Sequence, residues 1–151
     1  MGVGSWRDVS HELIQSLPGL NDQDMVENAT HIVDEIERTI KASKALLDNN
    51  IIQFGKLMLE SHVSLRDRYR VSCLELDQLV DLAMECEGVF GSRMTGGGFG
   101  GCTVTLVKKD KVGALKEYIK SKYTGGTLSF YECEPVGGAS TIGLAYLRHT
   151  K

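Results

Sequence analysis

Apolar side chains recur at steps of three and four residues through most of this chain, a spacing that predicts amphipathic helices. Helix-capping residues divide the pattern into five segments. A Ser-x-x-Asp capping box at Ser5 predicts the start of the first helix, and Pro18-Gly19 predicts its end. The other helices are expected from Asn21 or Asp22 to Asp48, from Asn50 to about Arg70, from a capping box at Ser72 to Gly88, and from Val112 to about Gly125.

The longest of these predicted helices carries a single apolar stripe, which it is expected to bury. The charged residues of the same segment fall on other faces, where contact with solvent explains them. The members of the stripe are Met25, Ala29, Ile32, Val33, Ile36, Ile40 and Leu47.

β-branched and apolar residues predict strands in the last third of the chain. Val89–Thr95 and Cys102–Val107 flank a short loop, Thr127–Cys133 alternates between apolar and polar residues, and Ile142–Leu147 is a possible last strand. Helices followed by a hairpin, a helix and a strand indicate the α+β class. The expected architecture is a set of helices packed on one face of a small antiparallel sheet.

The loop between the first two strands is the candidate functional site. Six of the eleven positions from Gly91 to Gly101 are glycine. Glycine costs backbone entropy, so such a cluster indicates positive φ angles in a sharp turn or close approach of the backbone to a ligand. A strand follows where a dinucleotide fingerprint needs a helix, and no Gly-Lys-Ser/Thr ending marks a Walker A loop. By itself, the string is more typical of a tight connection than of a phosphate site.

Composition and charge exclude several classes of function. Hydrophobic residues make up 42% and charged residues 25%, the range of a soluble globular protein, and the net charge of −3 indicates no nucleic-acid partner and no anionic membrane. No apolar run is long enough for a membrane span, and no secretory signal opens the chain. The four cysteines lack metal-binding spacing, which favours reduced core thiols in a cytoplasmic protein.

The order of residues around the glycines is far more specific than their number. Met94 to Val104 reads Met-Thr-Gly-Gly-Gly-Phe-Gly-Gly-Cys-Thr-Val and closely resembles the third conserved motif of galactokinases, within the GHMP family of small-molecule kinases. Glu60–Asp67 and Val71–Asp77 resemble the helical segment before that motif. The resemblance runs from about Leu20 to Tyr131. It implies that residues 1–151 form a single GHMP kinase C-terminal domain, ferredoxin-like in fold, with its glycine-rich motif at 91–102.

The resemblance implies transfer of the γ-phosphoryl group of ATP to the C1 hydroxyl of galactose, usually with Mg²⁺. Galactokinases carry their ATP loop, sugar signature and catalytic Asp and Arg in an N-terminal domain without counterpart here. That domain is therefore expected to hold ATP and Mg²⁺, and no catalytic or metal-binding residue is expected in this chain. The loop is expected to form part of the ATP and sugar cleft through Thr95, Gly96, Gly97, Gly98, Phe99, Gly100 and Gly101.

The missing N-terminal domain is an implied partner, together with galactose and ATP. Without it, the chain is expected to be inactive and to self-associate through apolar surface near Met94 and Phe99. Alternative functions are a galactokinase-like galactose sensor in transcriptional regulation, an N-acetylgalactosamine kinase, and an interaction protein. Because N-acetylgalactosamine kinases tend to show Gly-Ala-Gly-Trp-Gly-Gly, Gly97 and Phe99 favour galactose. His62 is as consistent with a buried hydrogen-bonding residue as with a functional one.

Overall fold

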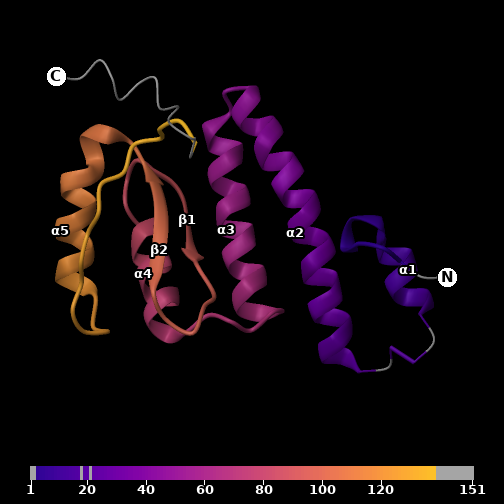
Figure 1. Cartoon of the computed structure of the whole chain (residues 1–151). Coiled ribbons are helices and arrows are strands. Elements are labelled where there is room, and N and C mark those ends of the chain that lie inside the picture. Colours follow the sequence, from indigo (N-terminus) through magenta and orange to yellow (C-terminus); the bar gives the residue numbers. More distant parts are fainter. Residues whose placement is uncertain (1–2, 18, 21, 139–151) are drawn as a thin grey trace, which may run out of the picture.

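The computed structural model describes residues 3–17, 19–20 and 22–138 (Figure 1). Its elements, in chain order, are the short 3-10 helix η1 (Trp6–Asp8), α1 (His11–Ser16), α2 (Gln23–Leu47), α3 (Ile51–Asp67), α4 (Leu74–Met84), β1 (Val89–Thr95), β2 (Cys102–Val107), the short 3-10 helix η2 (Lys109–Lys111) and α5 (Val112–Lys122). This arrangement confirms the predicted α+β class.

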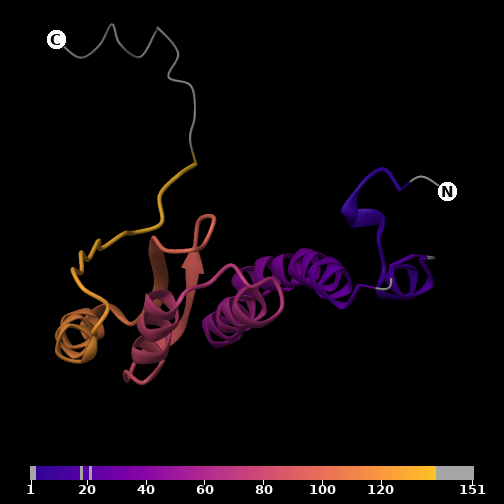
Figure 2. The same cartoon turned by 90° about the horizontal axis from the view of Figure 1, so that it is seen from below.

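Strands β1 and β2 form an antiparallel hairpin, with Thr95 opposite Cys102 at the end next to the glycine loop. Helices α3 and α4 pack against β1, α2 packs on α3, and α1 packs on α2 (Figures 1 and 2). Helix α5 lies on the far side of α4 and completes an apolar cluster around Ala83 and Ile119. The hairpin is therefore held by α3 and α4, which precede it in the chain, and by the apolar cluster that α5 completes.

Helix α3 and strand β1 approach each other at backbone distance. A Cβ atom added to Gly55 on α3 would lie 2.0 Å from the carbonyl oxygen of Phe90, and one added to Gly91 on β1 would lie 2.1 Å from the carbonyl oxygen of Gly55. No L-residue with a side chain fits at such distances, so this glycine pair sets how closely the helix seats against the strand.

Two predicted helix starts are confirmed by the side-chain caps. The Asp22 carboxylate accepts the N–H of Asp24 at 2.9 Å, and Asn50 Oδ1 accepts the N–H of Gln53 at 3.0 Å. Each side chain satisfies a backbone donor that a helix leaves unpaired in its first turn, which is why these residues start α2 and α3.

Both predicted capping boxes were wrong. Ser5 caps only η1, and α1 begins after Ser10, whose Oγ accepts the N–H of Leu13. Helix α4 begins after Cys73 without a side-chain cap, because the Ser72 hydroxyl donates to Asp77 instead. In each case a serine with an acidic residue three positions later found another partner.

The segment Thr127–Cys133 is not a strand, although its burial alternates as predicted. Leu128 and Phe130 are half-buried against the cluster between α4 and α5, while their neighbours are exposed. Among the described residues the sheet has two strands, so this segment makes apolar contacts without a ladder of backbone hydrogen bonds. The possible strand Ile142–Leu147 lies outside the described residues.

The ends of α4 and α5 and the cysteines also differ in part from the sequence prediction. Helix α4 ends at Met84, and Gly88, at φ 89°, lies in the turn that leads into β1. Helix α5 ends at Lys122, close to the predicted Gly125. All four cysteines are free, but Cys102 and Cys133 are exposed rather than core residues.

The apolar stripe of α2 is buried only in part. Ala29 and Val33 pack with Ile14 of α1, whereas Met25, Ile40 and Leu47 are 56%, 66% and 84% exposed. Because these three residues are exposed, the prediction that α2 buries its whole apolar stripe was wrong. The flank of α2 that meets α3 is partly polar. None of the described helices is long and apolar enough to span a membrane.

Candidate ligand loop

The glycine loop joins β1 to β2, whose bounds match the two predicted strands. Five of its backbone positions have φ angles in the left-handed region. These angles are 87° at Gly96, 85° at Gly98, 60° at Phe99, 135° at Gly100 and 102° at Gly101. Because L-residues with a side chain rarely adopt such angles, the turn alone requires glycine at most of these positions.

The tip of the loop is fastened to the connection between α3 and α4. The N–H of Phe99 donates to the carbonyl oxygen of Val71 at 2.7 Å. A Cβ atom added to Gly98 would lie 2.1 Å from the same oxygen, so the backbone at this point has no room for a side chain. Gly98 therefore needs to be glycine both for its φ angle and for its close contact.

The remaining loop glycines face open space. A Cβ atom added to Gly96, Gly97, Gly100 or Gly101 would meet no atom within 4 Å. Thr95 is exposed, and the ring of Phe99 is 76% exposed. The loop thus presents accessible backbone together with one large apolar side chain, an arrangement able to approach an anion or another protein surface.

Met94 does not contribute to that surface. Its side chain is fully buried. The predicted apolar surface near Met94 was therefore wrong, and Phe99 is the exposed apolar side chain of this region. Self-association of the chain stays a prediction.

Below the loop, His62 is a buried residue of α3. Its Nδ1 atom accepts the N–H of Met94 at 3.3 Å, and its Nε2 atom lies 3.3 Å from Asp77 Oδ1 without the alignment of a hydrogen bond. Burial lowers the pKa of His62, so the ring is neutral at pH 7. Because His62 has no exposed surface, it cannot touch a ligand, and the buried hydrogen-bonding interpretation holds.

A second buried histidine, His31 of α2, joins α2 to α3. Its Nδ1 atom lies 2.8 Å from Ser64 Oγ, and its ring stacks on Tyr69 at 4.6 Å between centroids. Burial lowers the pKa of His31 as well, and the nearby Arg38 acts in the same direction. The structure therefore contains two histidines that fold as neutral rings.

These two histidines predict a loss of stability in mild acid. Above a pH of about 6.5 the rings are neutral in both the folded and the unfolded chain. As the pH falls below that value the unfolded chain takes up protons first, and the free energy of unfolding decreases until the lowered folded-state pKa is reached. Urea unfolding should therefore show less stability at pH 5.5 than at pH 7.5, with a weaker dependence in His62→Asn. Stability that rises between pH 7.5 and 5.5 would contradict this.

The basic run that begins at Arg66 is fully paired. Arg66 bonds Asp67, while Arg68 bonds Asp34, and Arg70 bonds Asp24 and Glu27 on α2. The run therefore ties the end of α3 to α2, in addition to the pairing of Arg66 with its neighbour Asp67. No arginine of this run is left free for a phosphate.

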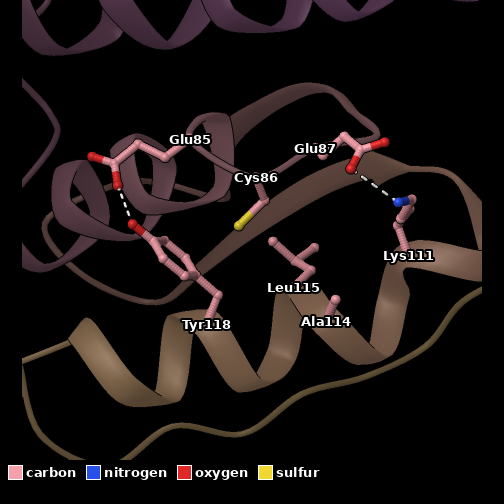
Figure 3. A pocket seen from close by; sticks show the side chains of 7 residues that line it. All are labelled: Glu85, Cys86, Glu87, Lys111, Ala114, Leu115 and Tyr118. Carbon is pink, nitrogen blue, oxygen red and sulfur yellow. Dashed lines mark hydrogen bonds and ion pairs between the residues drawn. The ribbon is translucent and has the colours of Figure 1, made fainter.

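Two hollows in the described surface lie away from the loop. One of about 300 Å³ lies between the end of α4 and α5, where Tyr118 donates to Glu85 and Lys111 pairs with Glu87 (Figure 3). Its polar groups are thus paired with one another. Another hollow, of about 490 Å³, lies between α2 and α3, and neither contains a loop residue. The loop is an open surface in this chain.

Metal ligands do not gather in the described part of the chain. Among residues 3–17, 19–20 and 22–138, no three His, Cys, Asp or Glu side chains are arranged to hold a metal ion. The exposed loop backbone fits a role beside an anionic ligand.

The fold and the loop define the class of protein. The family model for the C-terminal region of GHMP kinases matches residues 42–125, which include α3, α4, the hairpin and α5. The chain therefore belongs to the GHMP kinase family.

Its relatives include galactokinases. The chain is 46% identical to human galactokinase over 144 residues, 95% of this chain and 36% of the relative. It is 52% identical to the galactokinase of Clostridium acetobutylicum over 126 residues, 82% of this chain and 32% of the relative. The chain thus spans about a third of these relatives, and similarity to the human protein extends beyond the expected Leu20–Tyr131.

A solved structure agrees with these matches. Lactococcus lactis galactokinase complexed with galactose superposes with a TM-score of 0.74 at 39% identity, over 80% of this chain and 31% of that chain. This likeness supports the predicted GHMP kinase C-terminal architecture.

Sequence reasoning found the loop but missed its supports. Val71 and Asp77 stand out in the sequence only through the family resemblance, and Ser72 only through that resemblance and the predicted capping box, yet all three anchor the loop tip and its underside. The available signal was the run Val71–Asp77 itself, which carries polar residues into an otherwise apolar helix start.

Proposed function

We propose that this chain is the C-terminal part of a galactokinase. In the complete enzyme, the γ-phosphoryl group of ATP is transferred to the C1 hydroxyl of galactose. The observation that carries this proposal is the loop from Thr95 to Gly101, an exposed glycine turn in a domain that superposes on a galactokinase. The ATP dependence follows from membership of the GHMP kinase family.

The loop contributes position rather than chemistry. Catalysis of phosphoryl transfer rests on holding the two substrates in line and on stabilising charge. Gly96, Gly97, Gly100 and Gly101 offer backbone that a ligand or the ATP-binding domain can approach without meeting a Cβ atom. We propose that the loop forms a wall of the ATP and sugar cleft. We also propose that it supports the ATP loop of the enzyme, a segment that lies outside this chain.

Mg²⁺ and the catalytic groups belong to the part of the enzyme outside this chain. In the complete enzyme a bound Mg²⁺ would supply charge neutralisation to the ATP phosphates. The four free cysteines fit a reducing compartment, and we place the enzyme in the cytoplasm.

Galactose is the proposed sugar. The relatives described above are galactokinases, and Gly97 and Phe99 stand where N-acetylgalactosamine kinases tend to carry Ala and Trp. A coupled assay of ADP release from the full-length enzyme, with galactose and with N-acetylgalactosamine, tests this choice. A preference for N-acetylgalactosamine would overturn it.

The 151-residue chain alone is expected to have no kinase activity. The physical reason is that the loop can position a substrate only against the groups that react, and none of the loop residues is an acid or a base. The measurement is ADP release with galactose and Mg-ATP, compared with a sample without protein. Turnover clearly above that control would show that the catalytic residues are within this chain.

A further inference from the structure

Beneath the glycine loop lies a closed series of contacts that passes through His62. The N–H of Met94, on the strand that enters the loop, donates to His62 Nδ1 at 3.3 Å. The other ring nitrogen, Nε2, faces Asp77 Oδ1 on α4 at 3.3 Å. Asp77 Oδ1 in turn accepts the hydroxyl of Ser72.

The series returns to the loop at its tip. Ser72 follows Val71, whose carbonyl oxygen accepts the N–H of Phe99 at 2.7 Å. The entrance of the loop at Met94 and its tip at Phe99 are thus both hydrogen-bonded to the same region, where α3, α4 and the connection between them meet. His62 is the residue at which the contacts from α3, α4 and β1 meet.

The burial of His62 is costly. It is one of the largest side chains without exposed surface, and burying a polar ring destabilises the fold unless its nitrogens are paired. Within the described ranges, Nε2 of His62 is the one buried side-chain polar atom that lacks a hydrogen-bond partner. A leucine would remove the unpaired Nε2 atom but would leave the buried N–H of Met94 without its acceptor, so the ring contributes a contact as well as packing.

The protonation state follows from the geometry. Because Nδ1 accepts a backbone N–H, it carries no proton, and the neutral ring holds its proton on Nε2. Nε2 lies 3.3 Å from Asp77 Oδ1 without hydrogen-bond alignment, and the nearby carboxylate favours this tautomer electrostatically. The neutral ring can therefore accept from β1 on one side and face α4 on the other.

We propose that His62 is a positioning residue, which fixes the glycine loop by holding Met94 to α3 and orienting its ring against Asp77. The contact with Met94 holds the entrance of the loop in place. The contact with Asp77 keeps the His62 ring in the orientation that allows the contact with Met94. The role in catalysis rests on the function proposed above, whereas the role in holding the loop does not.

Two substitutions separate the two contacts. His62→Asn places an amide oxygen close to the position of Nδ1 and keeps an acceptor for Met94, but it does not reach Asp77. His62→Gln places its amide near Nε2 and keeps the group that faces Asp77, but it offers no acceptor to Met94. His62→Leu fills the space and removes both contacts.

The readout is hydrogen exchange of the Phe99 amide by NMR in this 151-residue chain, relative to amides of α5 that report global stability. His62→Gln and His62→Leu are expected to speed Phe99 exchange by about tenfold beyond the change in α5, the effect of losing one hydrogen bond. His62→Asn is expected to stay within about twofold of wild type. Equal changes in all three variants, or no loop-specific change, would show a merely structural histidine and overturn the proposal.

The catalytic consequence is measured in the full-length enzyme. His62→Gln should lower kcat for galactose several-fold more than His62→Asn, because only the former releases the loop. If wild type lacks galactokinase activity, the proposed function fails while the exchange result stands. If exchange follows the proposal and kcat is alike in both variants, the catalytic role of His62 is overturned.

Discussion

Gly98→Val is expected to remove most of the activity of the full-length kinase while the protein still folds. Gly98 has a φ of 85°, and a Cβ atom there would lie 2.1 Å from the carbonyl oxygen of Val71. A β-branched side chain must therefore push the loop away from the connection between α3 and α4 and break the Phe99 hydrogen bond.

The expected division between stability and activity has a physical basis. A strained backbone position costs on the order of 1–3 kcal/mol, which a domain of ordinary stability survives. Misplacing a substrate-positioning group by about 1 Å can cost about 100-fold in rate. We therefore expect kcat/KM for galactose to fall by about 100-fold or more, with only a modest decrease in melting temperature.

Gly97→Val is the matched control for fold. A Cβ atom at Gly97 meets no atom within 4 Å, and its φ is outside the left-handed region. Its melting temperature and the protection of the Phe99 amide should match wild type. Wild-type kinetics in Gly98→Val would contradict the prediction and reduce the glycines to a simple turn.

The hairpin and the start of the two long helices could be predicted from the sequence because their causes are local. Asp22 and Asn50 cap α2 and α3 with their own side chains, and the bounds of β1 and β2 follow from β-branched and apolar residues on either side of the glycines. The prediction at Ser72 failed because its hydroxyl donates to Asp77, two residues beyond the predicted capping-box partner Glu75.

The parts that could not be predicted depend on contacts between distant segments. The glycine string predicts the loop. The hydrogen bond between Phe99 and Val71, however, forms only because the connection between α3 and α4 passes under the loop. Likewise, the alternation of apolar and polar residues correctly predicts that Leu128 and Phe130 are half-buried. It cannot show whether a neighbouring strand forms hydrogen bonds with Thr127–Cys133.

Gly55→Ala is expected to destabilise the whole domain, and after the effect of Gly98→Val on activity this is the second large effect that we expect. Gly55 shows no functional signal in the sequence, yet its Cβ position lies 2.0 Å from the carbonyl oxygen of Phe90 and 2.3 Å from its carbonyl carbon. Both obstacles are backbone atoms of β1, so no side chain can rotate away. Helix α3 must move off the strand, and the packing that holds the hairpin from one side is lost.

The expected loss in the free energy of unfolding is about 3 kcal/mol, the upper range for overpacking a core site. It corresponds to a fall in melting temperature on the order of 10 °C.

Gly113→Ala is the matched control, because Gly113 lies exposed on α5 and its added Cβ meets no atom within 4 Å. Alanine favours a helix over glycine by roughly 1 kcal/mol, so this variant should be at least as stable as wild type. Circular dichroism melts of both variants test the pair. A melting temperature of Gly55→Ala within a few degrees of wild type would show that α3 and β1 can separate at little cost. The loop could then not depend on a rigid seat beneath β1.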